Sequence, residues 1–200
     1  MSIERIHINS SSDKNQVLEF CDLANDDIRP ASVNIKSTDW QNNSSSLMHK
    51  IFIDKIYDGD KAGYILYKDS DTGKILSGCG YHPFNIDPNI IVCYSRAYSP
   101  VDVFATVNHW QNFNEDSKRI TMENGFYGSV AYTNEYNRKL LRMLMILSNK
   151  ETFRNRKEDR WVVKMIGPYL IYNTRQLMLY SIHKEGYEQQ FLNLMEQYKV

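Results

Sequence analysis

Residues 90–102 read Ile-Ile-Val-Cys-Tyr-Ser-Arg-Ala-Tyr-Ser-Pro-Val-Asp, a run of β-branched and aromatic residues that passes directly into a helix start. The first nine residues predict a buried strand. Ser99 can cap a helix, Pro100 suits the first helical position, and Asp102 can reach back to the cap. We therefore expect a strand at 90–98 and a helix from 99 to about 114, with Trp110 on its buried face.

Outward from this junction, apolar alternation and turn residues predict further elements. Strands are expected at 2–8, 50–57, 62–68, 74–84, 126–132, 161–166 and 176–183, and helices at 13–23, 134–148 and 186–198. Residues 69–73 have the composition of a hairpin turn, so the middle of the chain is expected to be an antiparallel meander. Gly167 and Pro168 are expected to separate the last two strands. The fold class predicted is α/β (α+β), with a mixed, mostly antiparallel sheet flanked by helices.

The predicted helix at 134–148 has an apolar face and a basic face. Tyr136, Leu140, Leu141, Met143, Leu144 and Leu147 are expected to point inward, and Arg138, Lys139 and Arg142 outward. The polar tract 26–46 is expected to be a long surface loop, either a lid or a weakly ordered excursion.

Length and composition limit the kind of protein. Two hundred residues with 42% hydrophobic content predict a single domain, 1–200, with a real core. The 24 basic and 24 acidic side chains cancel, so no overall field favours nucleic acid or an anionic membrane as partner. The chain shows no signal-peptide pattern and no apolar run of membrane-spanning length, and we expect a cytoplasmic protein.

Thiols and imidazoles give no clear site. Cys21, Cys79 and Cys93 lack CxxC spacing and are expected to be reduced, structural thiols. A nucleophilic role for Cys93, beside Arg96, is the alternative, but it would need an activating neighbour. The five histidines are scattered without ligand spacing, so no metal site is expected.

The order of elements resembles the GNAT N-acyltransferase superfamily over residues 50–183. Two local motifs support the resemblance. The segment 132–141, Tyr-Thr-Asn-Glu-Tyr-Asn-Arg-Lys-Leu-Leu, is similar to the start of the helix that follows the fifth strand in that family. The string 93–98, Cys-Tyr-Ser-Arg-Ala-Tyr, resembles the strand end in small GNAT-like proteins encoded by bacteriophages, which would act in the host cytoplasm.

The resemblance implies an acetyl-CoA site where the strand at 90–98 splays from the strand at 126–132. It places Ser95, Arg96 and Ala97, together with Asn134, Asn137 and Arg138, at the cofactor, and makes Tyr98 and Tyr136 the candidate catalytic proton donors. From its chemistry alone, Arg96 at a strand end can bind a carboxylate or phosphate in bidentate fashion, although an ion pair to a neighbouring acid is equally consistent with the sequence.

Two departures from the family pattern keep other functions open. The phosphate loop has no glycine: Pro100 removes an amide donor and Asp102 places negative charge in the first helical turn. The usual general-acid Tyr is replaced, since Leu141 and Leu144 stand seven residues after Asn134 and Asn137. The chain is therefore either an acyl-CoA-dependent N-acyltransferase acting on a small-molecule or protein amine, or a catalytically silent module that binds a partner protein. An unrelated α+β domain is the third possibility.

Overall fold

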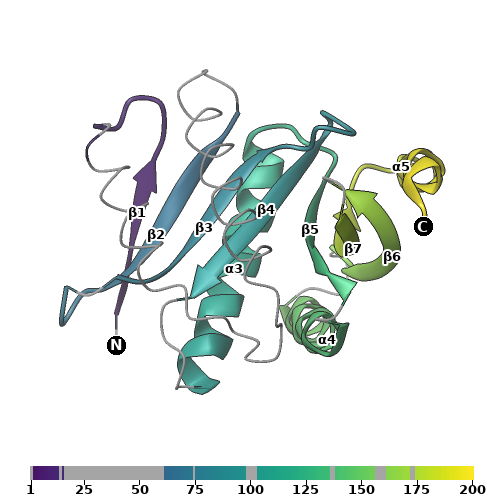
Figure 1. Ribbon diagram of the computed structural model, residues 1–200. Coiled ribbons are helices and arrows are strands. Elements are labelled where there is room, and N and C mark those ends of the chain that lie inside the picture. Colours follow the sequence, from purple (N-terminus) through teal and green to yellow (C-terminus); the bar gives the residue numbers. More distant parts are fainter. Residues whose placement is uncertain are drawn as a thin grey trace. The chain divides into compact units, whose positions relative to one another are not determined.

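The computed structural model describes residues 2–13, 15, 61–73, 75–97, 103–135, 138–155, 161–171 and 174–200 (Figure 1). Over these residues seven strands form one mixed sheet in the order β1-β2-β3-β4-β5-β7-β6. This confirms the predicted fold class. The strands are β1 (Ile3–Ile8), β2 (Gly63–Asp69), β3 (Ile75–Pro83), β4 (Ile90–Ala97), β5 (Gly128–Asn134), β6 (Lys164–Ile171) and β7 (Thr174–Ile182). The helices are α3 (Val103–Glu123), α4 (Arg138–Asn155) and α5 (Glu188–Met195), followed by the 3₁₀ turn η2 (Glu196–Tyr198).

The chain divides into two compact units, one of Met1–His82 with Ser95–His109 and one of Pro83–Tyr94 with Trp110–Val200. The predicted helix at 13–23, loop at 26–46, strand at 50–57 and helix start at 99–102 lie outside the residues that can be described, apart from short flanks.

The first unit contains the antiparallel β2–β3 hairpin that the sequence predicts as part of the meander, while the strand expected at 50–57 lies outside the described residues. β1 pairs with β2, and β2 with β3, both antiparallel. The hairpin turn is closed by a hydrogen bond from Gly73 N to Asp69 O, and Gly73 has a φ of 69°, which suits glycine. The buried Asp69 carboxylate accepts hydrogen bonds from Asp71 N and Thr72 Oγ1, each at 2.9 Å. These bonds lower the pKa of Asp69, which stays ionised and fixes the turn.

The second unit is built around one parallel strand pair. β4 runs parallel to β5, as expected for strands joined by a helical crossover, which here is α3. β7 then pairs antiparallel with both β5 and β6, so the last strand lies between the two that precede it (Figure 1).

One face of this second sheet segment is covered by α5. Phe191 and Met195 of α5 are fully buried and belong to one apolar cluster with Val92, Val130 and Met178. Because side chains alternate along a strand, Ser129 and Ala131 lie on the opposite face from Val130. The apolar core and the polar region described below therefore occupy the two faces of the same strands.

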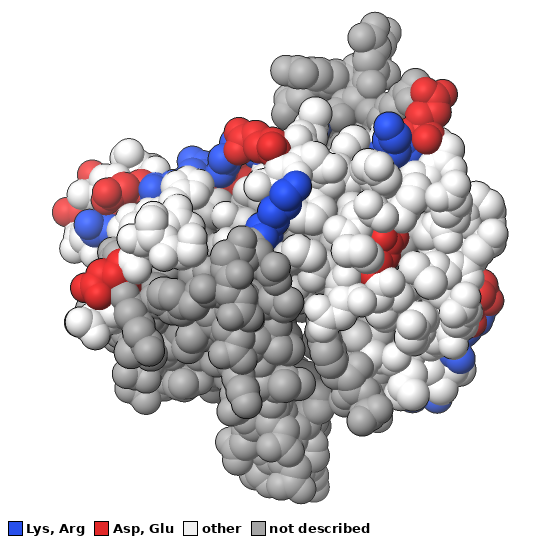
Figure 2. All heavy atoms as spheres, turned by 90° about the horizontal axis from the view of Figure 1, so that it is seen from above, with Lys and Arg blue, Asp and Glu red and all other residues white. Residues whose placement is uncertain are grey.

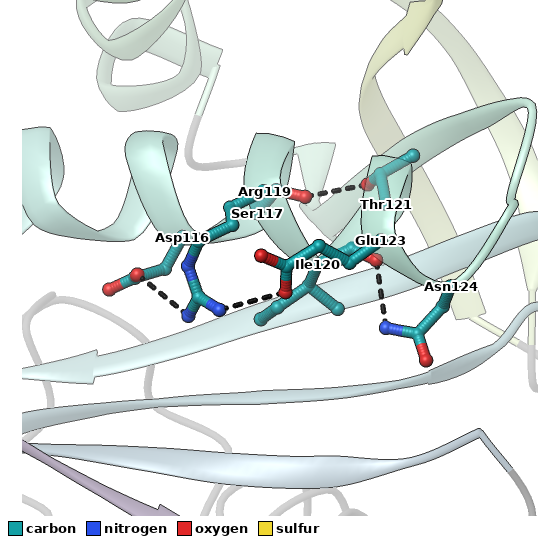
Figure 3. A network of polar contacts seen from close by, with 7 residues as sticks. All are labelled: Asp116, Ser117, Arg119, Ile120, Thr121, Glu123 and Asn124. Carbon is teal, nitrogen blue, oxygen red and sulfur yellow. Dashed lines mark hydrogen bonds and ion pairs between the residues drawn. The ribbon is translucent and has the colours of Figure 1, made fainter.

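Helix α3 is longer than predicted. It continues to Glu123 instead of ending near residue 114, because polar pairs support its last turns. Arg119 bonds to both Asp116 and Glu123, Thr121 Oγ1 donates to the Ser117 carbonyl, and Asn124 Nδ2 donates to the Ile120 carbonyl (Figure 3). The last bond supplies a partner for a carbonyl that the end of the helix leaves open.

Two further boundaries differ from expectation. Gly167 and Pro168 lie inside β6, where the register jumps between Ile166 and Tyr169, and do not separate two strands. Proline is tolerated there because β6 is an edge strand and its bulge requires no ladder N–H at that position. Helix α4 spans Arg138–Asn155, later than the predicted 134–148, and Met143 is 45% exposed although it was expected to point inward. Trp110 is buried, as predicted.

The described surface carries charges of both signs. In the view of Figure 2, acidic and basic side chains lie close together at the left and are sparse elsewhere, and neither sign forms a large area. None of the helices in the described part of the chain is both long and apolar enough to cross a bilayer.

Candidate functional site

The parallel pairing of β4 with β5 is short. Three residue pairs join the two strands, Ile90 with Gly128, Ile91 with Ser129, and Val92 with Val130. Over the described residues no pair follows, although β4 continues through Cys93 and β5 remains paired with β7 up to Asn134. Among the described residues, the pairing of the two strands therefore ends at Val92 and Val130.

A small cavity of about 30 Å³ lies where this pairing ends, within the second unit. Its lining comes from β4, β5, β7, α3, α4 and the segment that precedes β6. The residues are Cys93, Trp110, Phe113, Asn114, Ser117, Ser129, Val130, Ala131, Ser148, Trp161, Val163, Leu179, Tyr180 and Ser181. Of these only Asn114 and Ala131 are partly exposed, and Ala131 follows directly after Val130, the last paired residue of β5.

The two long helices are tied together above this cavity. The Trp110 indole N–H of α3 donates to Ser148 Oγ of α4 at 3.0 Å, and both residues are buried. Trp110 also stacks on Phe113, with ring centroids 4.9 Å apart. The bond satisfies an indole that would otherwise be costly to bury, and it fixes the helix pair over the strands.

Cys93 is a buried thiol in the same lining. Burial raises its pKa to about 12, and a hydrogen bond with Ser117 only partly counteracts this. At neutral pH the residue is therefore protonated, because a thiolate with so little solvation is unstable. The alternative of a nucleophilic Cys93 is not supported by this environment.

The loop that leads into β4 is held rigidly. The buried Asp87 carboxylate accepts hydrogen bonds from Asn89 N at 3.0 Å and from Tyr187 Oη at 2.9 and 3.1 Å. Burial and the bond to Asp87 raise the pKa of Tyr187, so its hydroxyl remains a donor. This clamp joins the start of β4 to the turn before α5 and sets the position of the strand.

Solved structures of acetyltransferases share this fold over nearly the whole chain. Spermidine/spermine N-acetyltransferase SpeG from Vibrio cholerae has a TM-score of 0.52 at 10% sequence identity, covering 96% of this chain and 98% of that one. Aminoglycoside acetyltransferase AAC(6')-Ib in complex with coenzyme A has a TM-score of 0.58 at 5% identity, covering 95% and 99%. The same enzyme with ribostamycin and coenzyme A also has a TM-score of 0.58, at 6% identity over 92% and 94%.

The chain has the GNAT acetyltransferase fold. The likeness is in the fold alone, because identities are 10% or lower. No family model matches the sequence, and no curated protein matches it either.

The residues that were predicted to form a GNAT site fall at the ends of three elements. Ser95, Arg96 and Ala97 are the last three residues of β4, Asn134 is the last residue of β5, and Arg138 is the first of α4, with its side chain exposed. Tyr98, Tyr136 and Asn137 lie outside the described residues, so their roles stay predictions. Among the residues that can be described, no group of three or more His, Cys, Asp or Glu side chains could hold a metal ion.

Sequence reasoning missed the serines of the cavity. Ser117, Ser129, Ser148 and Ser181 are each 8% exposed or less. The available signal was their position: Ser129 precedes Val130 and Ala131, Ser181 follows the apolar run 177–180, and Ser148 follows Ile146 and Leu147 in a helix. A small polar residue in a buried pattern indicates a hydrogen-bonded site, although it does not say with which other residues.

Proposed function

We propose that this chain is an acyl-CoA-dependent N-acyltransferase that moves an acetyl group from acetyl-CoA to the nitrogen of a small amine. The observation that carries the proposal is the parallel β4–β5 pair that stops after Val92 and Val130, in a fold shared with acetyltransferases that bind coenzyme A. Where two neighbouring strands no longer bond to each other, their backbone N–H and C=O groups can form hydrogen bonds with the extended pantetheine part of an acyl-CoA. A cytoplasmic setting is part of the proposal.

The reaction requires one bond to form and one to break. The neutral amine attacks the thioester carbonyl carbon, the C–N bond forms, and the C–S bond breaks. The nitrogen releases one proton and the departing sulfur takes one, so no other reactant is needed. Tyr98 or Tyr136 would donate the proton to the sulfur, and holding the two reactants together would supply much of the rate.

Basic and amide side chains from two strand ends would bind the cofactor. We assign its phosphates to Arg96, with Ser95 and Ala97 beside it, and to Arg138, with Asn134 and Asn137 contributing amide groups. A guanidinium is suited to this role because it binds phosphate in bidentate fashion. The proposed site suits the acyl end of acetyl-CoA better than its diphosphate end. Pro100 and Asp102 make the predicted helix start a weaker binding site for an anion.

The class of amine acceptor is proposed from the solved structures that share the fold. SpeG acts on spermidine and spermine, and AAC(6')-Ib structures contain kanamycin or ribostamycin. A flexible polyamine or an aminosugar is therefore the acceptor that we would screen first. A lysine side chain of a protein is the alternative that the same assay can detect.

Calorimetric titration of the full chain with acetyl-CoA tests the proposal. We expect saturable binding that Arg96→Ala weakens about 10- to 100-fold, the loss expected for a charge-assisted contact. Lys150→Ala, which removes one positive charge from an exposed position of α4, should leave the affinity unchanged. Acetyl-pantetheine, which lacks the diphosphate assigned to Arg96, should bind more weakly than acetyl-CoA, and Arg96→Ala should hardly change its affinity.

Release of free CoA thiol in the presence of spermidine, kanamycin or a lysine peptide then measures turnover. Absence of binding at millimolar acetyl-CoA would reject the enzyme and leave a silent module that binds a partner protein. Binding without turnover on any amine would restrict the proposal to cofactor binding.

A further inference from the structure

The cavity beside the β4–β5 divergence contains a polar group without a visible partner. Ser181 of β7 is 1% exposed, and none of the described residues offers its Oγ a hydrogen bond. A buried hydroxyl in this state lowers stability, because folding removes its bond to water without replacing it. Such a group requires an explanation, and an ordered water is the commonest one.

The lining of the cavity can supply the other bonds of that water. Ser129 lies directly across from Ser181 in the β5–β7 register, on the same face of the sheet. Ser117 approaches from α3, Ser148 from α4, and the thiol of Cys93 from β4. Hydroxyl groups therefore reach an otherwise mostly apolar cavity from three directions, and a bound water needs two to four such polar partners.

The size of the space agrees with this chemistry. About 30 Å³ exceeds the roughly 10–15 Å³ that one water molecule needs, yet it is too small for a drug-sized ligand. Asn114 and Ala131 are the two partly exposed residues of the lining.

We propose that this serine-lined cavity is a hydration site that binds one or two ordered water molecules, one of them hydrogen-bonded to Ser181 Oγ. The water joins β7 to β5 and to the helices α3 and α4 where no direct side-chain bond connects Ser181 to them. The site does not depend on acyl transfer, and it would exist equally in a silent module with this fold.

The sign of a stability change tests the proposal. If water satisfies Ser181, Ser181→Ala removes one of its bonds, and the unfolding equilibrium constant should rise about tenfold, which equals about 1.4 kcal/mol. If the cavity is dry, the same variant deletes an unsatisfied hydroxyl and should leave stability unchanged or raise it. Ser10→Ala, at an exposed serine in the turn after β1, is the matched control and should have no effect. Urea unfolding without any CoA compound gives the three values.

A crystal structure of the full wild-type chain provides a readout that does not rely on a variant. Solvent density within hydrogen-bond distance of Ser181 Oγ is expected, and xenon should not enter under pressure. Xenon in the cavity, or a stabilised Ser181→Ala, would overturn the proposal. Failure of acetyl-CoA to bind would leave it untouched, so the two proposals fail independently.

Discussion

At the scale of single residues, buried polar groups decide how the second unit is held together. Trp110 and Ser148 form one hydrogen bond between α3 and α4, while Ser181 has none to the described residues. The two cases differ in what truncation does. Removing the acceptor of a satisfied pair leaves the donor buried and unpaired, so the loss exceeds the value of the bond itself.

Trp110→Phe should therefore destabilise the chain by about 1–2 kcal/mol, from the lost hydrogen bond and a smaller ring. Ser148→Ala should cost about 1 kcal/mol, because it leaves the indole N–H without an acceptor. The double variant should cost less than the sum of the two, since either change already breaks the bond. Urea unfolding of the four proteins measures the coupling, and strict additivity would show that the 3.0 Å contact contributes nothing.

At the scale of elements, the local sequence pattern was sufficient to predict a strand or turn wherever a short stretch contains characteristic residues. The hairpin at 69–73 and the strand β7 were predicted because turn residues and apolar alternation are visible in a short window. The end of α3 was misplaced for a physical reason. Its inward face changes from apolar residues to Asp116 and Ser117, which a sequence pattern takes for surface, but both are buried. Gly167 and Pro168 were wrongly predicted to separate two strands. The sequence does not show that β6 is an edge strand, and only this position allows the two residues inside it.

Close pairing of β5 with β7 depends on Gly128. A Cβ at this position would collide with the carbonyl oxygen of Ser181 and would lie 2.6 Å from the Ile182 side chain. Gly128→Ala should therefore destabilise the chain by about 1–3 kcal/mol, as expected for overpacking against backbone.

Gly125→Ala is the comparison for Gly128→Ala. Gly125 has open space around it but a φ of 73°, so its cost should come from backbone conformation alone, about 1 kcal/mol. Amide hydrogen exchange should show faster exchange in β5 and β7 only for the Gly128 variant. Equal protection in the two variants would mean that the sheet accommodates the methyl group.

At the scale of the whole molecule, the candidate site could be predicted only in outline. The end of β4 and the order of elements indicated where a cofactor would bind. The cavity could not be predicted, because Ser129 meets Ser181 only through the pairing of β5 with β7, and Cys93 comes near them only through the pairing of β4 with β5. Alternation assigns a residue to a face, but register decides which residues of two strands become neighbours.

Stability of the whole chain should also depend on pH through His183. Burial lowers the pKa of this histidine, and the adjacent Lys184 lowers it further. Its ring stacks on the buried Trp161, and among the described residues Nδ1 has no partner that could stabilise a charged imidazolium. The unfolded chain therefore binds this proton more readily than the folded chain. Its contribution to stability is complete above about pH 6.5 and is lost as pH falls through that value toward the folded pKa.

His183→Gln should flatten this part of the pH profile, because glutamine keeps a polar group and cannot take a proton. His7→Gln, at an exposed histidine of β1, should retain the wild-type slope. Urea unfolding at pH 8, 7, 6 and 5 compares the three proteins. The expected result is a wild-type free energy of unfolding that falls more steeply below pH 7 than that of the His183 variant. Parallel profiles would show that the proton is taken up elsewhere, and that the indole face and Lys184 do not keep His183 neutral.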